Sequence, residues 1–256
     1  TNILLEMTME RHISMGGIVI LLSATLPSFR RKRFGRMVCP FLSCAPLPQE
    51  YPLVTRVLAS GTKYFTPSTA VPEYGTRTVK LETVRTENAL PTDELYERMV
   101  RDMRRGCAVA VVCNTVDNAM EVWGRLKAMG RTGDDVSLFH ARFRPPDRAE
   151  KERRVIGSFG RNRIPSRGSI LVATQVIEQS LDLDFDILYT QICPVELLFQ
   201  RMGRLFRHEL EGRVAREPLC IVMSPKDDLF GVHSLLYGGE VIGGTRLSAL
   251  LWRTRC

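Results

Sequence analysis

Three arginines occur at regular spacing in residues 200–208 (QRMGRLFRH), at the end of an apolar run. Arg201, Arg204 and Arg207 are three residues apart, and side chains at this spacing lie on roughly one face of a helix. A guanidinium group is permanently charged and can bind a carboxylate or a phosphate through two parallel hydrogen bonds. We therefore predict a helix over 194–207 that is anchored in the core and presents three cations to an anion.

Polar side chains follow the predicted strands at the points where those strands end. Because the carboxyl ends of parallel strands meet at one edge of a sheet, where ligands gather, these side chains should lie together. Neutral donors and fixed cations are the groups that position and neutralise a nucleic-acid backbone or a nucleotide phosphate. The set comprises Asn114, Thr115, His140, Arg142, Arg144, Thr174, Gln175, Glu178, Asp182 and Asp184.

Alternating signals from Gly106 onward predict the elements that position these groups. Short, continuous apolar runs are typical of strands covered on both faces, and helical spacing occurs between them. Strands are predicted at 107–113, 136–140, 169–174, 186–191 and 219–223, and helices at 115–130, 145–160 and 194–207. Repeated β–α units of this length predict an α/β fold, in which helices cover both faces of a parallel sheet.

The first third of the chain differs from the rest. The apolar run 16–27 predicts one more buried strand that stops in a Ser-Ala-Thr turn, and a basic stretch at 30–36 follows on a predicted helix. Residues 44–80 are rich in Pro, Tyr and Thr, and predict strands and a connector. An amphipathic pattern is already running at the first residue, so we expect a piece of a longer protein. The predicted divisions are the end of a first domain with a connector (1–84), a second domain (85–224) and the start of a linker (225–256).

Composition limits the class of protein. The net charge of +8, from 36 Lys and Arg against 28 Asp and Glu, favours polyanionic partners, although a protein that is simply basic would fit as well. The seven cysteines form no CxxC pair, which predicts reduced core thiols in a cytoplasmic protein and no structural metal. We expect no signal peptide, and the apolar runs are too short to cross a bilayer.

Each feature taken alone also has a simpler structural interpretation. Asn and Thr after a strand are common N-caps of the following helix. A histidine at a strand end can be a buried core residue, and aspartates can belong to a turn. These alternatives concern Asn114, Thr115, His140, Asp182, Asp184, the stretch 30–36 as a solvated helix face, and Arg201, which could pair with Glu196 or Glu209.

Four segments, taken in order, resemble the later motifs of superfamily 2 helicases. They are Ser23-Ala24-Thr25, 111–115 (VVCNT), 173–186 (ATQVIEQSLDLDFD) and 200–208. In that superfamily two RecA-like domains hold ATP between them. The first motif belongs to the first domain and the other three belong to the second, so this chain should contain a complete second RecA-like domain after the last strands of a first.

The resemblance implies a role for each matching residue. The arginine fingers directed at the γ-phosphate would be Arg204 and Arg207, supported by Gln200 and Arg201. Gly203 would let the chain approach the nucleotide closely, and Asp182 would lie near the nucleotide and in the coupling network. The residues that contact nucleic acid would be Asn114, Thr115, His140, Arg142, Arg144, Thr174 and Gln175. The residues that couple the two domains would be Ser23, Ala24, Thr25 and Glu178.

A closer resemblance is to the helicase–nuclease of type I CRISPR–Cas systems. It is carried by 1–27, 139–148 (FHARFRPPDR), 173–186, 193–208 and 249–254 (ALLWRT). It implies an ATP-dependent DNA helicase that is recruited to a guide-RNA effector complex, moves along single-stranded DNA and, in the full-length protein, degrades it in antiviral defence. In that family a Walker A loop, an Asp-Glu box and usually an HD nuclease domain precede the part matched here.

This chain contains no G-x-x-x-x-G-K-[ST] sequence. The resemblance therefore implies that ATP and Mg are held mainly by a part that is absent from this sequence, and that the chain alone is inactive. Two alternatives stay open from the sequence: a generic superfamily 2 RNA or DNA helicase domain, and a non-catalytic nucleic-acid-binding fragment.

Overall fold

The computed structural model describes residues 2–22, 28–41, 54–65, 78–129, 135–178 and 181–226. The chain divides into two compact units, Thr1–Thr76 and Arg77–Cys256. Among the described residues no helix is long and apolar enough to cross a membrane. The cysteines that the structure describes are all free thiols, and four of them are buried, namely Cys107, Cys113, Cys193 and Cys220.

The second unit is built on a six-stranded sheet in which every neighbouring pair of strands is parallel. In sheet order the strands are β3 (Lys80–Thr86), β8 (Leu219–Pro225), β7 (Ile187–Gln191), β4 (Ala108–Val112), β6 (Ser169–Ala173) and β5 (Val136–Phe139). The central strands β4, β6 and β7 are buried along their whole length, as continuous apolar runs require in a sheet covered on both faces. The predicted α/β fold with a parallel sheet is confirmed.

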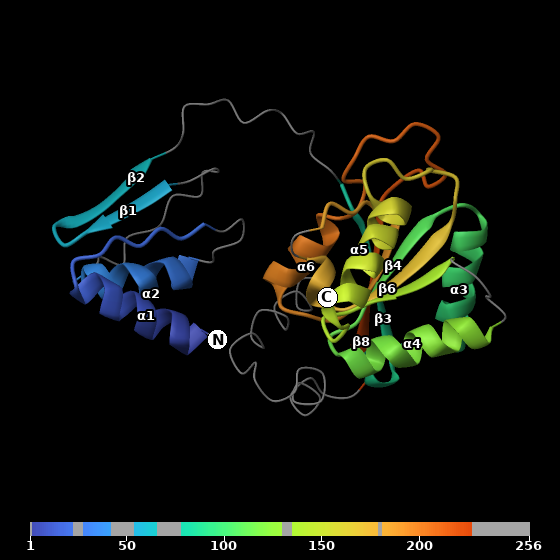
Figure 1. Cartoon of the computed structure of the whole chain (residues 1–256), viewed down its shortest axis with the longest axis horizontal. Coiled ribbons are helices and arrows are strands. Elements are labelled where there is room, and N and C mark those ends of the chain that lie inside the picture. The colour runs from blue at the N-terminus through green and yellow to red at the C-terminus, as the bar shows by residue number, and fades with distance from the viewer. Residues whose placement is uncertain are drawn as a thin grey trace. The chain divides into compact units, whose positions relative to one another are not determined.

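Helices cover the two faces of this sheet (Figure 1). On one face lie α3 (Asp93–Arg104) and α4 (Val116–Ala128), and on the other lie α5 (Pro145–Phe159) and α6 (Val195–Met202). Side chains of β4 alternate between two cores, so that Val109 and Val111 pack with α3 and α4 while Ala110 and Val112 pack with α5 and α6. Two short 3₁₀ helices, η1 (Glu87–Ala89) and η2 (Gln175–Ile177), complete the unit.

The boundary between the units lies eight residues before the predicted one. We expected the second domain to begin at residue 85, but β3 pairs with β8 over its whole length, from Lys80 with Leu219 to Thr86 with Pro225. The sequence of β3 is a mixture of charged, polar and apolar residues, and its pairing partner lies more than a hundred residues away in the chain. A local pattern therefore could not assign it to the second sheet.

The described residues of the first unit form two helices and a hairpin. These are α1 (Asn2–Ser14), α2 (Ser28–Val38) and the antiparallel strands β1 (Val54–Leu58) and β2 (Gly61–Phe65). The helix predicted for the basic stretch 30–36 is confirmed by α2.

The buried strand predicted at 16–27 is wrong for the residues that the structure describes. Residues 17–22 form neither helix nor strand, and Ile18, Ile20 and Leu22 are 84%, 79% and 92% exposed. A strand is stable only when a neighbouring strand satisfies its backbone groups, and no described strand pairs with this segment. The predicted turn Ser23-Ala24-Thr25 lies outside the described residues.

The helix predicted over 194–207 is shorter than expected. It ends at Met202, and Gly203 is its C-cap. Beyond it the chain turns back to pair with the segment before β7: the Phe185 N–H donates to Arg204 O at 2.9 Å, and the Phe206 N–H donates to Phe185 O at 2.9 Å. These bonds, together with a φ of 46° at Phe206, replace the next helical turn. The three arginines therefore do not share one helix face.

Candidate functional site

Arg201 is the centre of a buried hydrogen-bond network. Its side chain is fully buried, and its Nε donates to Glu178 Oε1 at 2.7 Å. Nη1 donates to Thr190 Oγ1 on β7 at 2.7 Å, and Nη2 donates to Asn114 Oδ1 after β4 at 3.2 Å. Burial raises the pKa of the Glu178 carboxyl group, and the charge of Arg201 opposes that rise. Arg201 therefore joins α6 to the carboxyl ends of β4, β6 and β7.

Arg204 is almost as deeply placed but has fewer partners. It is 9% exposed, and its Nη2 donates to the backbone oxygen of Glu178 at 2.9 Å. Within the described residues no carboxylate lies within 4.0 Å of its guanidinium group. Burial and the nearby charge of Arg207 lower the pKa of Arg204, while Asp182 and Glu178 act in the opposite direction. Its positive charge is thus only partly compensated by the protein around it.

Arg207 lies nearer the surface and is paired. Its Nε donates to Asp182 Oδ1 at 2.6 Å, and His208 Nε2 lies 3.0 Å from the same oxygen. Although partial burial acts to raise it, the pKa of Asp182 is lowered, because Arg207 donates to the carboxylate and the interaction with His208 acts in the same direction. The side chains of Arg207 and Asp182 are about half exposed. Arg207 and Asp182, which were predicted to have different roles at the nucleotide, are in direct contact.

Two further predicted residues lie on α6 and at its end. Gln200 is half-buried in the last turn of the helix. At Gly203 an added Cβ would lie 3.3 Å from Phe199 O and 3.4 Å from Gln200 O, and φ is −63°. A side chain at position 203 would therefore be only slightly crowded by the end of α6.

Three predicted residues at the ends of β4 and β6 are held by the protein itself. Asn114 is buried, its Nδ2 donates to Ile192 O at 2.9 Å, and Gln175 Nε2 donates to Asn114 O at 2.8 Å. Thr115 is the N-cap of α4, where its Oγ1 accepts a hydrogen bond from the Asn118 N–H at 3.2 Å. The helix-cap alternative is thus correct for Thr115.

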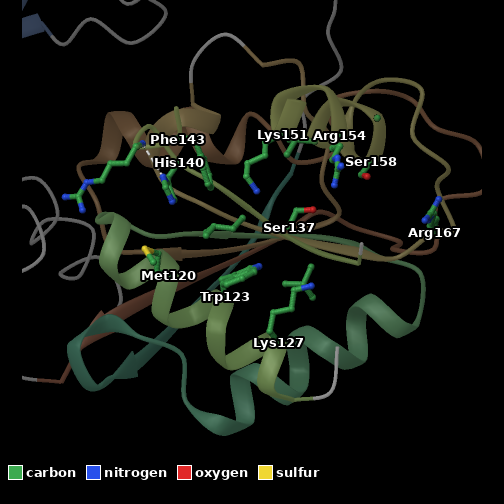
Figure 2. A pocket seen from close by; sticks show the side chains of 15 residues that line it. Met120, Trp123, Lys127, Ser137, His140, Phe143, Lys151, Arg154, Ser158 and Arg167 are labelled. Carbon is green, nitrogen blue, oxygen red and sulfur yellow. Dashed lines mark hydrogen bonds between the residues drawn. The ribbon is translucent and has the colours of Figure 1, made fainter. Parts of the chain in front are cut away.

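The remaining predicted residues lie around β5 and the end of β6. His140 is buried and stacks on Phe143 with ring centroids 4.0 Å apart, and its Nδ1 accepts a hydrogen bond from the Arg142 N–H (Figure 2). Burial lowers the pKa of His140, and the charges of Arg142 and Lys151 lower it further. Thr174 is buried, whereas the side chains of Arg142 and Arg144 are exposed.

Sequence reasoning missed a buried cluster of two aspartates and two arginines. Asp184 and Asp186 are fully buried, Arg163 Nη2 donates to Asp186 Oδ1 at 2.8 Å, and Arg213 Nη2 donates to Asp184 at 2.9 Å. Asp184 also accepts from the His208 N–H at 2.6 Å, so the cluster holds the loop that follows α6. The available signal was two acids beside a strand rich in apolar residues, since buried carboxylates need cationic partners.

Comparison with known proteins finds similarity to Cas3 proteins. The family model described as "CRISPR-associated nuclease/helicase Cas3, C-terminal" matches residues 105–210. The CRISPR-associated endonuclease/helicase Cas3 of Escherichia coli (strain K12) is 38% identical over 260 residues, which cover 99% of this chain and 28% of that protein. Over nearly its whole length, this chain is similar to part of a Cas3 protein. This confirms the resemblance to the helicase–nuclease of type I CRISPR–Cas systems.

Solved Cas3-type structures share the fold. The crystal structure of T. fusca Cas3-ATP is 28% identical, with a TM-score of 0.70, and the match covers 91% of this chain and 30% of that chain. A structure described as a CRISPR RNA-guided surveillance complex, pre-nicking, matches with 26% identity and a TM-score of 0.75, over 99% of this chain and 33% of that chain. The chain thus spans about a third or less of the length of these relatives.

The part matched by the Cas3 family model contains the whole arginine site. Residues 105–210 run from the start of β4 through α6 to the loop that holds Arg204 and Arg207. Asn114, Glu178 and Asp182 lie in the same part. The Cas3-like RecA-type sheet therefore brings together, at the carboxyl ends of β4, β6 and β7, residues that are up to ninety positions apart in the chain.

Proposed function

We propose that this chain is the second RecA-like domain of an ATP-dependent Cas3 DNA helicase. In this proposal Arg204 and Arg207 act on the γ-phosphate of an ATP molecule held mainly by a first RecA-like domain. The observation that carries the proposal is the state of Arg204: a guanidinium group that is nine-tenths buried and has a backbone oxygen as its described partner. Burying such a cation without a carboxylate partner costs free energy unless another anion completes the site.

The residues around Arg204 suit a phosphate ligand. Arg201 holds Glu178 in place by donating to the Glu178 carboxylate, and the backbone oxygen of Glu178 in turn orients Arg204. Arg207 is held by Asp182 at 2.6 Å, which fixes a second guanidinium group nearby in the chain. ATP, when bound, supplies the phosphoryl group whose transfer develops negative charge on its oxygens. Preorganised guanidinium groups stabilise that charge without having to reorganise.

Magnesium is better placed outside this chain. Among the described residues no group of three His, Cys, Asp or Glu side chains could hold a metal ion. The two fully buried aspartates, Asp184 and Asp186, are already paired with arginines. We therefore propose that Mg, like most of the ATP-binding groups, belongs to the preceding domain.

Glu178 provides a route for coupling between the two ligands. It follows η2, which starts at Gln175 directly after Thr174, where nucleic acid is proposed to bind. Its carboxylate and its backbone oxygen contact Arg201 and Arg204 respectively. A shift of the segment after β6 would therefore be transmitted to the arginine site. We propose that Ser23, Ala24 and Thr25 form the corresponding part of the first domain.

The activity of the chain alone provides a first test. We expect no Mg-dependent ATP hydrolysis above background from the isolated chain, because it lacks a phosphate-binding loop of the P-loop type. A steady-state phosphate-release assay on the purified chain measures this. Turnover that persists through purification, and that the Arg204→Ala variant abolishes, would contradict the proposed division of the ATP site between two domains.

Binding to single-stranded DNA provides a second test. We propose that the exposed side chains of Arg142 and Arg144 contact the phosphate backbone. The affinity for oligo(dT) should be weak and should fall steeply with salt, and each arginine replaced by alanine should reduce the slope of log K against log[salt] by about 0.7. Fluorescence anisotropy at several salt concentrations measures the slope.

The control for this experiment is Arg216→Ala. Arg216 is exposed but precedes β8, at the amino ends of the strands. Arg216→Ala therefore removes the same charge as Arg142→Ala, but at the opposite ends of the strands. A slope that falls by the same amount in Arg216→Ala as in Arg142→Ala would mean that general charge, and not the predicted edge, binds the DNA.

For the full-length protein we also propose recruitment to a CRISPR guide-RNA effector complex and degradation of the target DNA.

A further inference from the structure

A groove of about 900 Å³ runs along β5, one of the two edge strands of the sheet, between α4 and α5 (Figure 2). Trp123 and Lys127 of α4 line one side, and Lys151 and Arg154 of α5 line the other. His140 and Phe143 lie at one end and Arg167 at the other. The groove therefore starts at the sheet edge where nucleic acid is proposed to bind and continues along the side of the domain.

The described side chains that line the groove carry charge of one sign. Among these described residues there are five cations and no carboxylate: Lys127, Arg142, Lys151, Arg154 and Arg167. Two of these have acidic neighbours on the rim, since Arg154 pairs with Glu150 at 2.5 Å and Arg142 with Asp117 at 3.3 Å. Both pairs are more than half exposed, so they contribute little and are readily exchanged for another anion.

Aromatic rings lie between these cations. Phe143 stacks on His140, and Lys151 Nζ lies 4.5 Å from the centroid of the Phe143 ring. Trp123 lies partly exposed on the α4 side. A track of cations with interleaved aromatic planes binds single-stranded nucleic acid without sequence preference, because phosphates meet the cations and bases stack on the rings.

An acidic peptide added to the edge of the sheet fits less well. The Ile170 N–H donates to Asp135 O and the Thr174 N–H donates to Phe139 O. The backbone groups of alternate residues of β5 therefore point toward β6, and those of Val136 and Leu138 point toward the groove. Val136 is only 4% exposed, however, which leaves Leu138 alone to offer accessible backbone groups. One accessible residue cannot support the ladder of main-chain bonds that strand addition requires.

We propose that this groove is a second contact for single-stranded DNA, which continues the strand bound at the edge near Arg142. The inference rests on the proposed DNA binding, but it makes a separate claim about Lys151, Arg154 and Trp123. The edge would hold the phosphates of a short oligonucleotide, and the groove would add contacts only when the strand is long enough to extend along β5.

The test uses charge reversal on α5 with a matched control. The groove variant is Lys151→Glu with Arg154→Glu, and the control is Arg148→Glu with Arg153→Glu, which makes the same charge change at exposed positions of α5 outside the groove lining. Oligo(dT) of two lengths, about 4 and about 16 nucleotides, spans the range of site sizes seen in single-strand binders. Circular dichroism and thermal melting check that both variants keep the fold.

The groove variant should lower the affinity for the longer oligonucleotide about tenfold more than the control does. It should also reduce the slope of log K against log[salt] for that oligonucleotide by about 1.4, as expected for two lost phosphate contacts. The two variants should differ much less in their affinity for the shorter oligonucleotide. Equal effects of groove variant and control on the longer strand would overturn the groove proposal while leaving binding at the edge intact. If the wild-type chain binds neither oligonucleotide at low salt, the proposed DNA-binding function itself is wrong.

A second readout reports on the groove directly. The chain contains two tryptophans, Trp123 and Trp252, so the Trp252→Phe variant leaves Trp123 as the single reporter. Stacking of a base should quench its fluorescence on addition of the longer oligo(dT), and the groove variant should remove this quenching. Fluorescence that is unchanged at saturation would count against the proposal. Oligoglutamate binding that depends on Lys151, while oligo(dT) binding does not, would assign the groove to an acidic peptide instead.

Discussion

Replacement of Arg204 by alanine is expected to reduce kcat for ATP hydrolysis by about 10³-fold in a full-length protein that contains this chain behind a complete first RecA-like domain. The reason is the position of its guanidinium group, which is buried, oriented by Glu178 O and not paired with a described carboxylate. Arg207→Ala should have an effect of similar size. Arg204→Lys should restore little, because an ammonium group cannot reproduce the guanidinium fork.

Stability must be measured on the same variants. If Arg204 only satisfies the Glu178 carbonyl, its removal should lower the melting temperature and leave kcat unchanged. A matched control is Arg161→Ala, an exposed arginine in the loop after α5, which should change neither quantity appreciably. An unchanged kcat for both Arg204→Ala and Arg207→Ala would refute the arginine-finger proposal.

Replacement of Arg201 by methionine should lower the free energy of unfolding by about 3–5 kcal/mol, as breaking one side of a buried ion pair does. The carboxylate of Glu178 would be left buried without its cation, and Thr190 and Asn114 would each lose a hydrogen-bond donor. Denaturant unfolding of the whole chain, followed by circular dichroism, measures the change.

Two further variants separate the ion pair from general effects. The double variant Arg201→Met with Glu178→Leu should recover much of the loss, since replacing both partners by apolar groups removes the unpaired charge. Arg142→Met, at an exposed pair with Asp117, should cost about 0–1 kcal/mol. A loss below about 1 kcal/mol in Arg201→Met would show that the buried network does not hold the three strand ends together.

Local patterns in the sequence were sufficient for most of the second unit from β4 to β8. The apolar runs that became β4, β5, β6, β7 and β8 were identified to within about two residues, because a strand covered on both faces must be continuously apolar. The family resemblance marked Arg207 and Asp182 as separate site residues, whereas their direct contact became visible only in the structure. The family itself could be recognised because motif residues and their spacing are properties of the sequence.

The helix over 194–207 shows where local reasoning failed. Its periodicity continued through Arg204, but hydrogen bonds between Phe185 and the segment 204–206 end the helix at Met202. Those partners lie about twenty residues earlier in the chain, so no window around the helix could reveal them. In the same way the exposed segment 17–22 has the composition of a buried strand but lacks a described neighbour.

By itself, the sequence determined the α/β class, the order of the elements from β4 to β8, and the resemblance of the arginine motif to that of a helicase family. Only the tertiary structure decided that its three arginines have different environments: Arg201 fully buried in a network, Arg204 buried with a carbonyl partner, and Arg207 paired near the surface. The physical reason is that motif residues reflect chemistry that any member must keep, whereas burial and charge compensation depend on residues distant in the chain. Asp184 and Asp186 illustrate this, because their partners Arg163 and Arg213 are about twenty to thirty residues away on either side.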